Sequence, residues 1–320
     1  MQTGEVDSAR GAAADTGRRG PGRRGVLLAA LGGAVLLGGG AGAAMVEDLL
    51  PGGVPLRRAL GLTGPDGTVP AVTPGPVHTS TVRSRARGSE VKLVTMVPPG
   101  ADPAALPVCL VLHGRGGDAR TMVELGMPQF LAAAVAHGVP PFALVALDGG
   151  DNSYWHRRSA GDDPQRMLLE EVPGWLRARG LSRATAGVPR AALGISMGGS
   201  GALQYALGRG GAVDAVAAVS PAVFRTWADA ATTGGYNDEA DWQAHEPLLA
   251  LARPRGRRLG VWCGTEDPFC AAARTLADRG GAVERHFPRG EHTDGFWRRI
   301  MPEAFAFVGH SLKSAAGGSS

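Results

Sequence analysis

Short apolar runs alternate with longer amphipathic stretches along the chain from residue 81 to residue 313. The short runs fit strands, and the longer stretches carry apolar residues at the spacing of a helix face. This alternation predicts an α/β fold, in which a mostly parallel central sheet is flanked by crossover helices. We expect strands at Val91–Val97, Val108–Leu112, Ala143–Leu147, Ala191–Ile195, Ala215–Val219, Arg258–Cys263 and Val283–Phe287. We expect helices at Gln129–Ala136, Met167–Ala178, Gly199–Leu207, Ala271–Asp278 and Phe296–Leu312.

The segments on either side of this region lack a sustained hydrophobic period. Residues 46–80 are rich in Pro and Gly and predict a linker or a loosely packed prosegment. Residues 314–320 hold only Ser, Ala and Gly and predict a flexible tail. One α/β domain therefore remains at 81–313, and in such a sheet the chemistry gathers beyond the carboxyl ends of the strands.

Residues 1–45 have the pattern of an export signal. An arginine pair at 23–24 precedes an apolar, glycine-rich stretch at 26–45, in which 41–43 fit the small-residue rule for a cleavage site. The pair resembles a twin-arginine signal, although Val26 replaces the usual aromatic residue, so the general secretory route stays open. An uncleaved membrane anchor is the alternative, since about 20 apolar residues span a bilayer, but glycine-rich helices insert weakly. We expect an exported protein, extracellular or in the cell envelope, that contacts membrane only through this segment if it is uncleaved.

Charge and composition argue against several classes of partner. Basic residues outnumber acidic ones by only 33 to 29, and nearly all are Arg, with Lys only at 92 and 313. A scattered excess of this size does not predict a nucleic acid partner. The chain also lacks metal-ligand spacing and a phosphate-cradling loop, so we expect no cofactor and no metal.

A Gly-x-Ser-x-Gly pentapeptide at 194–198 follows one predicted strand and opens into a predicted helix. A strand that turns at once into a helix holds its corner residue in a strained conformation, and side chains at either flank would collide. The corner residue then presents its side chain beyond the edge of the sheet. The pattern predicts Ser196 as a nucleophile.

A serine nucleophile needs a base to remove its proton and an acid to orient that base. In this fold type the chain order is serine, then acid, then histidine. Asp267 lies in a turn after the predicted strand at 258–263, and His292 lies in a loop after the last predicted strand. Glu266 is the alternative acid, but Pro268 biases Asp267 toward an extended conformation that suits an inward side chain. The other histidines weighed lie in a strand, on the terminal helix, in the linker and at a helix end: His286, His310, His78 and His137.

The negative oxygen of a tetrahedral intermediate needs fixed backbone N–H donors. Met197 follows the candidate nucleophile at the start of a helix, where the helix dipole also helps. Arg115, in the loop at 112–117 that follows a central strand, is the predicted second donor. Alternatively, the glycines of this loop serve only to make a tight turn.

Two further segments are candidates for substrate contact. The loop at 148–158 follows a central strand, and its Tyr154, Trp155 and His156 either line the substrate entrance or pack the interior. The segment at 222–247 follows the fifth predicted strand, where this fold accepts cap-like insertions. We expect it to supply an acyl pocket.

The three cysteines allow at most one disulfide. Cys263 and Cys270 flank the loop that carries Asp267, and an exported protein meets oxidising conditions. A bridge between them would stiffen that loop, and two free buried thiols are the alternative. Cys109 lies in a predicted buried strand.

Taken together, these residues resemble the esterase family of α/β-hydrolases that includes esterase D, feruloyl esterase modules and the antigen 85 mycolyltransferases. The resemblance spans about residues 80–312 and rests on Leu112-His-Gly-Arg-Gly-Gly, Asp151-Asn-Ser-Tyr-Trp-His, Gly194-Ile-Ser-Met-Gly-Gly-Ser-Gly-Ala-Leu, Ser220-Pro-Ala, Cys263-Gly-Thr-Glu-Asp-Pro-Phe, Gly290-Glu-His-Thr and Phe296-Trp-Arg. It implies an α/β-hydrolase fold with Ser196 as nucleophile, Asp267 as acid and His292 as base. It likewise implies the amides of Met197 and Arg115 as oxyanion donors.

The sequence therefore predicts an exported serine hydrolase that cleaves a carboxylic ester of a small molecule, lipid or glycan through an acyl-enzyme. Acyl transfer to a sugar or lipid alcohol is the alternative, because water and alcohols compete for the same intermediate. The acyltransferases of the resembling group typically carry Glu as the acid and a hydrophobic residue in place of Arg115, which favours hydrolysis here. A third interpretation is a surface binding module that keeps the scaffold without turnover.

Overall fold

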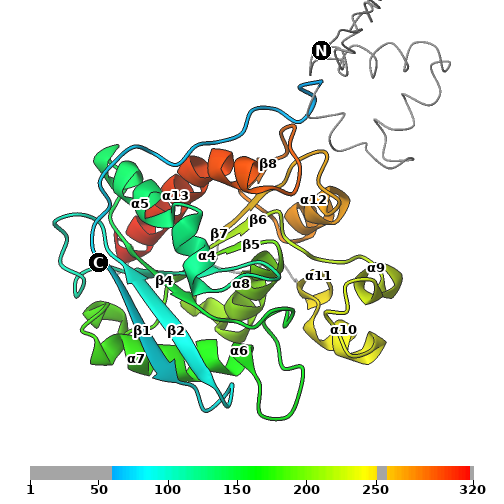
Figure 1. The fold of residues 1–320 in the computed structure, drawn as a ribbon, viewed down its shortest axis with the longest axis horizontal. Helices are drawn as coiled ribbons and strands as arrows, with labels where there is room; N and C mark the ends of the chain where they lie inside the picture. Colours follow the sequence, from blue (N-terminus) through cyan, green and yellow to red (C-terminus); the bar gives the residue numbers. More distant parts are fainter. Residues whose placement is uncertain (1–59, 251–257, 318–320) are drawn as a thin grey trace, which may run out of the picture. The chain divides into compact units, whose positions relative to one another are not determined.

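The computed structural model describes residues 60–250 and 258–317, with side chains up to residue 312. Within these residues one sheet of eight strands runs in the order β1-β2-β4-β3-β5-β6-β7-β8 (Figure 1). The strands are β1 (Val77–Arg83), β2 (Glu90–Met96), β3 (Val108–Leu112), β4 (Ala143–Leu147), β5 (Ala191–Ile195), β6 (Ala215–Val219), β7 (Arg258–Trp262) and β8 (Glu284–His286). The α-helices are α4 (Ala119–Glu124), α5 (Met127–Ala136), α6 (Pro164–Arg166), α7 (Val172–Ala178), α8 (Met197–Gly208), α9 (Trp227–Ala231), α10 (Glu239–His245), α11 (Pro247–Ala250), α12 (Cys270–Arg279) and α13 (Asp294–Gly317).

The strands from β3 to β8 are parallel, and β2 runs antiparallel to both β1 and β4. Every residue of β3, β4, β5 and β6 is buried, because helices cover both faces of the parallel part of the sheet. This confirms the predicted α/β class. Those four strands have the bounds expected from the sequence, and the ends of β2, β7 and β8 differ by one residue.

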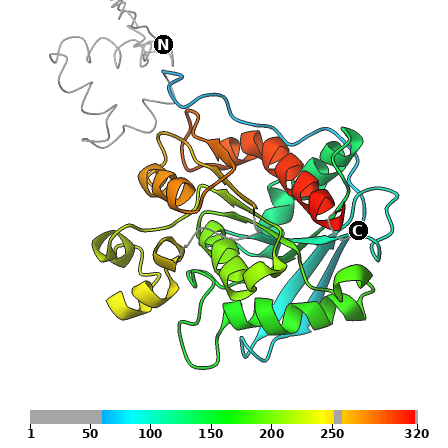
Figure 2. The ribbon, with the colours of Figure 1, turned by 180° about the vertical axis from the view of Figure 1, so that it is seen from behind.

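Alternate residues of each strand enter two separate hydrophobic clusters, as the period of two of a strand requires. In β3, Val108 and Leu110 pack on the side of α7, α8 and α12, whereas Cys109 and Val111 pack on the side of α4, α5 and α13. The two helical layers lie on opposite faces of the sheet in Figures 1 and 2. The carboxyl ends of the central strands therefore open between these two layers.

Strand β1 was not expected, since it begins at Val77 within the stretch at 46–80 interpreted as a linker. Its residues alternate between exposed and half-buried, so it lacks the apolar run that marks a buried strand. The chain ahead of it also contacts the domain, where Gly67 N–H donates to the carbonyl oxygen of Gly295 over 2.7 Å. The compact unit that holds the sheet begins at Gly61, ahead of the boundary expected at residue 81.

The predicted helix at Met167–Ala178 is interrupted by a π-helical turn, η1 (Met167–Glu171). Pro173 has no N–H to donate to the carbonyl of Leu169, which instead accepts a hydrogen bond from the Arg209 guanidinium. Proline therefore explains the local change in helix type.

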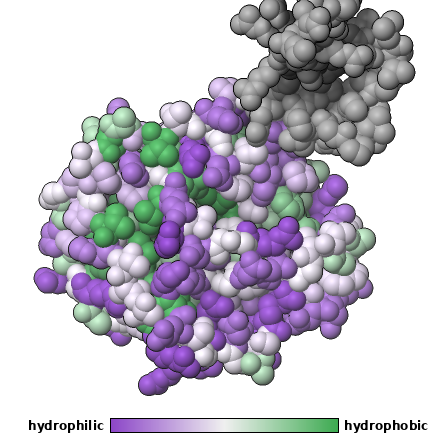
Figure 3. All heavy atoms as spheres, viewed as in Figure 1, coloured by the Kyte–Doolittle hydropathy of each residue, from purple (hydrophilic) through white to green (hydrophobic). Residues whose placement is uncertain are grey.

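The insertion expected after the fifth predicted strand is present as α9, α10 and α11, which gather at one side of the sheet (Figure 1). We call residues 222–250 the cap. Hydrophilic and apolar side chains are interspersed on the face shown in Figure 3. Among the described residues, no helix is long and apolar enough to cross a bilayer. The expected export signal at 1–45 and most of the tail at 314–320 lie outside the residues described in full.

Candidate active site

Ser196 occupies the single residue between β5 and α8 and adopts a φ of 56° and a ψ of −121°. Few residues with a side chain take a positive φ, so the turn is strained. Its two flanking glycines are required sterically. A Cβ at Gly194 would overlap the carbonyl oxygen of Gly198, and a Cβ at Gly198 would overlap that of Leu112.

The imidazole of His292 lies between Ser196 and Asp267. His292 Nε2 is 2.9 Å from Ser196 Oγ, and His292 Nδ1 is 2.8 Å from Asp267 Oδ2. An ionised carboxylate only accepts hydrogen bonds, so Nδ1 carries a proton and Nε2 accepts from the serine hydroxyl. The Asp267 side chain is fully buried, and that of His292 is 25% exposed. The three predicted residues are thus brought together, although 96 positions separate Ser196 from His292.

The neighbouring acid, Glu266, faces another direction. Its Oε2 accepts hydrogen bonds from Gly290 N–H at 2.6 Å and from the Thr265 hydroxyl at 2.8 Å. Asp267 Oδ1 accepts from Phe269 N–H at 2.9 Å, which fixes the carboxylate while Oδ2 faces the imidazole. Of the two acids left open by the sequence, Asp267 is the one that contacts His292.

Two aromatic rings hold the imidazole edge-on. Phe269 and Trp297 lie 5.2 and 5.1 Å from the His292 ring centre, at steep angles to its plane. Trp297 Nε1 donates to the hydroxyl of Ser220 over 3.1 Å, and Ser220 is buried directly after β6 with a φ of 44°. No role was predicted for these residues, although Ser220-Pro-Ala and Phe296-Trp-Arg are among the motifs that carry the family resemblance.

The loop after β3 passes directly beside the serine. A Cβ added at Gly114 would lie 3.3 Å from Ser196 Cβ. The buried His113 ring anchors this loop, since its Nδ1 donates to Gly114 C=O at 2.8 Å and its Nε2 accepts from Gly149 N–H at 2.8 Å. Burial lowers the pKa of His113, which keeps the ring neutral as these two bonds require. Arg115, the next residue, has an exposed side chain.

The side chains of Tyr154, Trp155 and His156 are buried, with exposures of 3%, 0% and 0%. Trp155 Nε1 donates to the carbonyl oxygen of His113, and its ring fills the space left by Gly149 and Gly201. Of the two roles left open for these residues, the structure favours packing. Their contacts support the loops around the site.

A cavity of about 340 Å³ lies between the cap and the start of α12. Phe269, which contacts His292, is one of its walls, so the cavity adjoins the serine site. Its other lining residues come from the cap, the loop before α12 and α12 itself: Val223, Phe224, Arg225, Asp229, Thr232, Thr233, Pro268, Ala271 and Ala272.

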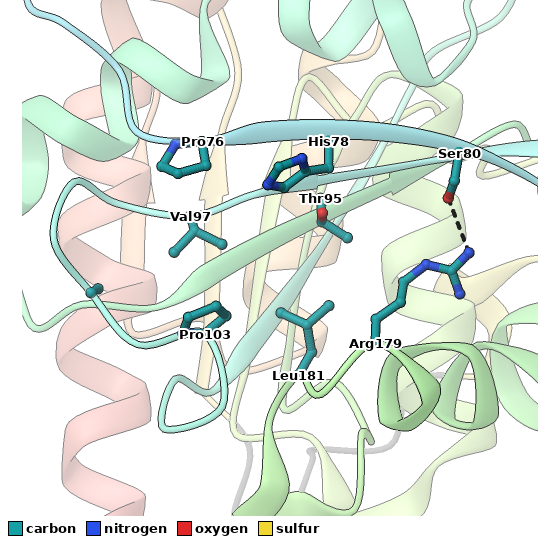
Figure 4. Close-up of a pocket in the computed structure, with 9 residues that line it drawn as sticks. Pro76, His78, Ser80, Thr95, Val97, Pro103, Arg179 and Leu181 are labelled. Atoms are coloured by element: carbon teal, nitrogen blue, oxygen red, sulfur yellow. Dashed lines mark hydrogen bonds between the residues drawn. The ribbon is translucent and has the colours of Figure 1, made fainter.

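A second cavity, of about 420 Å³, lies over β1, β2 and the end of α7 (Figure 4). Arg179 marks one end of it, where the guanidinium donates to the Ser80 hydroxyl. None of its lining residues belongs to the Ser196 site.

All three cysteines lie among the described residues and are free. Of the two states that the sequence left open for Cys263 and Cys270, the structure has the two free thiols and not the bridge. The hydrogen bond to Cys270 and burial raise the pKa of the Cys263 thiol, so it stays protonated. Cys109 is fully buried in β3, as expected.

The sheet order and the strand-to-helix turn at Ser196 define an α/β-hydrolase. The family model described as "Putative esterase" matches residues 84–306, so the chain belongs to that family of serine esterases. No curated protein matches the chain.

Several solved structures share the fold at low sequence identity. A ferulic acid esterase is 18% identical with a TM-score of 0.63, covering 75% of this chain and 100% of its own. The fluorophosphonate-binding serine hydrolase F of Staphylococcus aureus is 17% identical with a TM-score of 0.59, and the match covers 74% of this chain and 99% of the hydrolase. MPT51 of Mycobacterium tuberculosis is 18% identical with a TM-score of 0.59, and the match covers 74% of this chain and 99% of MPT51.

Proposed function

We propose that the chain is an exported serine esterase in which Ser196, His292 and Asp267 form the catalytic triad. The observation that carries the proposal is the pair of hydrogen bonds that His292 makes to the other two residues. Ser196 Oγ bonds to the ester carbonyl carbon while its proton moves to His292 Nε2, and Asp267 stabilises the imidazolium. The alcohol then leaves with that proton, and a water molecule activated by His292 hydrolyses the acyl-enzyme.

The backbone amides of Met197 and Arg115 are the proposed donors to the tetrahedral oxygen. Met197 is the first residue of α8, and the N–H groups of a first turn have no acceptor within their helix. Arg115 follows Gly114, which adjoins Ser196. Loss of one such donor typically slows turnover by about 100- to 1000-fold.

The cavity beside His292 is the proposed acyl pocket. Its aromatic walls, Phe224 and Phe269, suit a compact apolar or aromatic acyl group, and the similarity of fold to a ferulic acid esterase agrees with this class. A panel of chromogenic esters of rising acyl length, with feruloyl and glycosyl esters included, tests it. Preference for long acyl chains would contradict this assignment.

A fluorophosphonate probe tests the nucleophile. The wild-type chain should take up one probe per molecule, and Ser196→Ala should lose both labelling and about a millionfold in kcat. Ser200→Ala, a buried serine one turn further along α8, serves as the matched control and should keep the label. A labelled Ser196→Ala variant would contradict the assignment. A wild type with neither label nor turnover would favour a binding module.

Acyl transfer of the antigen 85 kind is the second candidate function, since family membership leaves it open. Product analysis with trehalose or glycerol present separates the two. Free acid in excess of acylated acceptor supports hydrolysis, and the reverse supports transfer.

Export is proposed from the pattern at 1–45 alone. Replacing the arginine pair at 23–24 with lysines should block passage through a twin-arginine route and leave the protein inside the cell. Unchanged export would indicate the general secretory route, and an intracellular wild type would contradict export.

A further inference from the structure

Three side chains with metal-binding atoms converge where α10 of the cap meets the loop after β4. His156 comes from the loop after β4, and Asp241 and His245 lie one turn apart on α10. One ligand atom from each residue lies within 4.8 Å of the other two. The expectation of no metal rested on the spacing of ligands along the chain, and 85 positions separate His156 from Asp241.

The carboxylate lies between the two imidazoles. Asp241 Oδ2 is 3.4 Å from His156 Nε2, and Asp241 Oδ1 is 2.9 Å from His245 Nδ1. The two rings stack with their centres 4.4 Å apart. Asn237 N–H donates to Asp241 Oδ2 over 2.8 Å, which fixes the carboxylate in the way that outer contacts orient metal ligands.

We propose that His156, Asp241 and His245 bind one divalent transition metal ion, with zinc the best match. Two neutral imidazoles and one carboxylate form a donor set typical of zinc, whose ligands lie about 2.0–2.2 Å from the ion. Tetrahedral ligands at that radius are about 3.4 Å from one another. The separations in the cluster approach this value. A metal ion lies in the plane of each imidazole that binds it, so binding requires the half-exposed His245 ring to turn out of its stack on His156.

The environment also leaves room for a fourth ligand. His156 is fully buried, whereas the Asp241 and His245 side chains are 12% and 35% exposed. Both of these line a cavity of about 480 Å³, which admits a water molecule or a small anion. Acidic and basic side chains balance around that cavity: Asp163, Asp238, Arg157 and Arg158.

Bound metal would fasten α10 to the loop after β4. His156 stacks on Tyr236 at 5.1 Å, and Tyr236 contacts Phe224, a wall of the proposed acyl pocket. The ion would therefore hold the cap in place without entering the ester chemistry. This role does not depend on the proposed triad.

The test uses the full chain, freed of metal with a chelator and titrated with Zn²⁺ by calorimetry. We expect one tight site, a higher thermal midpoint with Zn²⁺, and, with Co²⁺, the strong visible absorption of a tetrahedral ion. His245→Ala and Asp241→Asn should each weaken binding about 100-fold or more and remove the thermal shift. His137→Ala changes an exposed histidine directly after α5, and this matched control should bind like the wild type.

Equal Zn²⁺ affinity in the wild type and His245→Ala would overturn the proposal, as would the absence of a saturable site in the wild type. Either result would leave the cluster as a hydrogen-bonded network centred on Asp241. Circular dichroism of the metal-free variants shows whether each has folded. If His245→Ala does not fold, Asp241→Asn, which keeps the shape of the side chain, provides the decisive comparison.

Discussion

The strained backbone of Ser196 depends on the absence of side chains at two neighbouring positions. We predict that Gly194→Ala lowers the free energy of unfolding by about 3 kcal/mol, because its Cβ would meet the backbone of Gly198. Gly211→Ala is the control, since a Cβ there meets nothing within 4 Å, and it should change stability by less than about 0.5 kcal/mol. Urea unfolding measures both. Equal stabilities of the two variants would show that the turn relaxes easily.

The acid of the site provides a second comparison at the scale of single residues. Asp267→Asn should lower kcat about ten-thousandfold, because the amide no longer holds the imidazole in the tautomer that accepts the serine proton. Glu266→Gln should lower kcat far less, since Glu266 accepts hydrogen bonds from Gly290 and Thr265 and does not contact His292. Steady-state kinetics on one ester measures both. A greater loss in Glu266→Gln would reverse the assignment.

Among the elements, the cap depends on one buried carboxyl group. Burial raises the pKa of Glu246 to about 7, although its carboxylate accepts hydrogen bonds from Phe224 N–H and Leu248 N–H. Because the folded protein binds this proton more tightly than the unfolded chain does, protonation of Glu246 stabilises the fold. The contribution is full below the unfolded-state pKa, near 4.5, and is lost as the pH rises through the folded-state pKa of about 7.

We therefore predict that the free energy of unfolding contributed by Glu246 falls by roughly 3 kcal/mol between pH 4.5 and pH 7.5. Glu246→Gln cannot ionise and should lack this component. The measurement is the difference in unfolding free energy between wild type and variant across that range, which cancels the titration of other groups. A difference that stays constant with pH would contradict the buried, proton-binding state.

At the scale of the whole molecule, residues 61–320 form the compact unit. A chain that begins at Gly61 should keep the thermal midpoint and the esterase activity of the full protein. A chain that begins at Ser84 lacks β1 and exposes the edge of β2, so its midpoint should fall by about 5 °C or more and it should aggregate. Scanning calorimetry and size-exclusion chromatography test this pair. Equal midpoints would show that β1 adds no stability.

The sequence by itself determined the parallel strands and the turn at Ser196. A strand buried on both faces must be apolar throughout, and a strand-to-helix corner must have small neighbours, so both leave a local signature at β3 to β6 and at 194–198. The positions of Asp267 and His292 after strand ends followed from chain order. Strand β1 left no such signature, because a half-exposed edge strand tolerates polar residues.

Only the tertiary structure decided which side chains meet. Asp267 contacts His292 whereas Glu266 faces Gly290, and Tyr154, Trp155 and His156 are buried. The thiols of Cys263 and Cys270 are free, and His156 lies against α10. The physical reason is that local pattern reports the face and the period of an element, whereas contacts between residues far apart in the chain depend on how whole elements pack. A histidine that follows a tryptophan, as His156 does, has the same sequence whether it lines a pocket, fills a core or binds an ion.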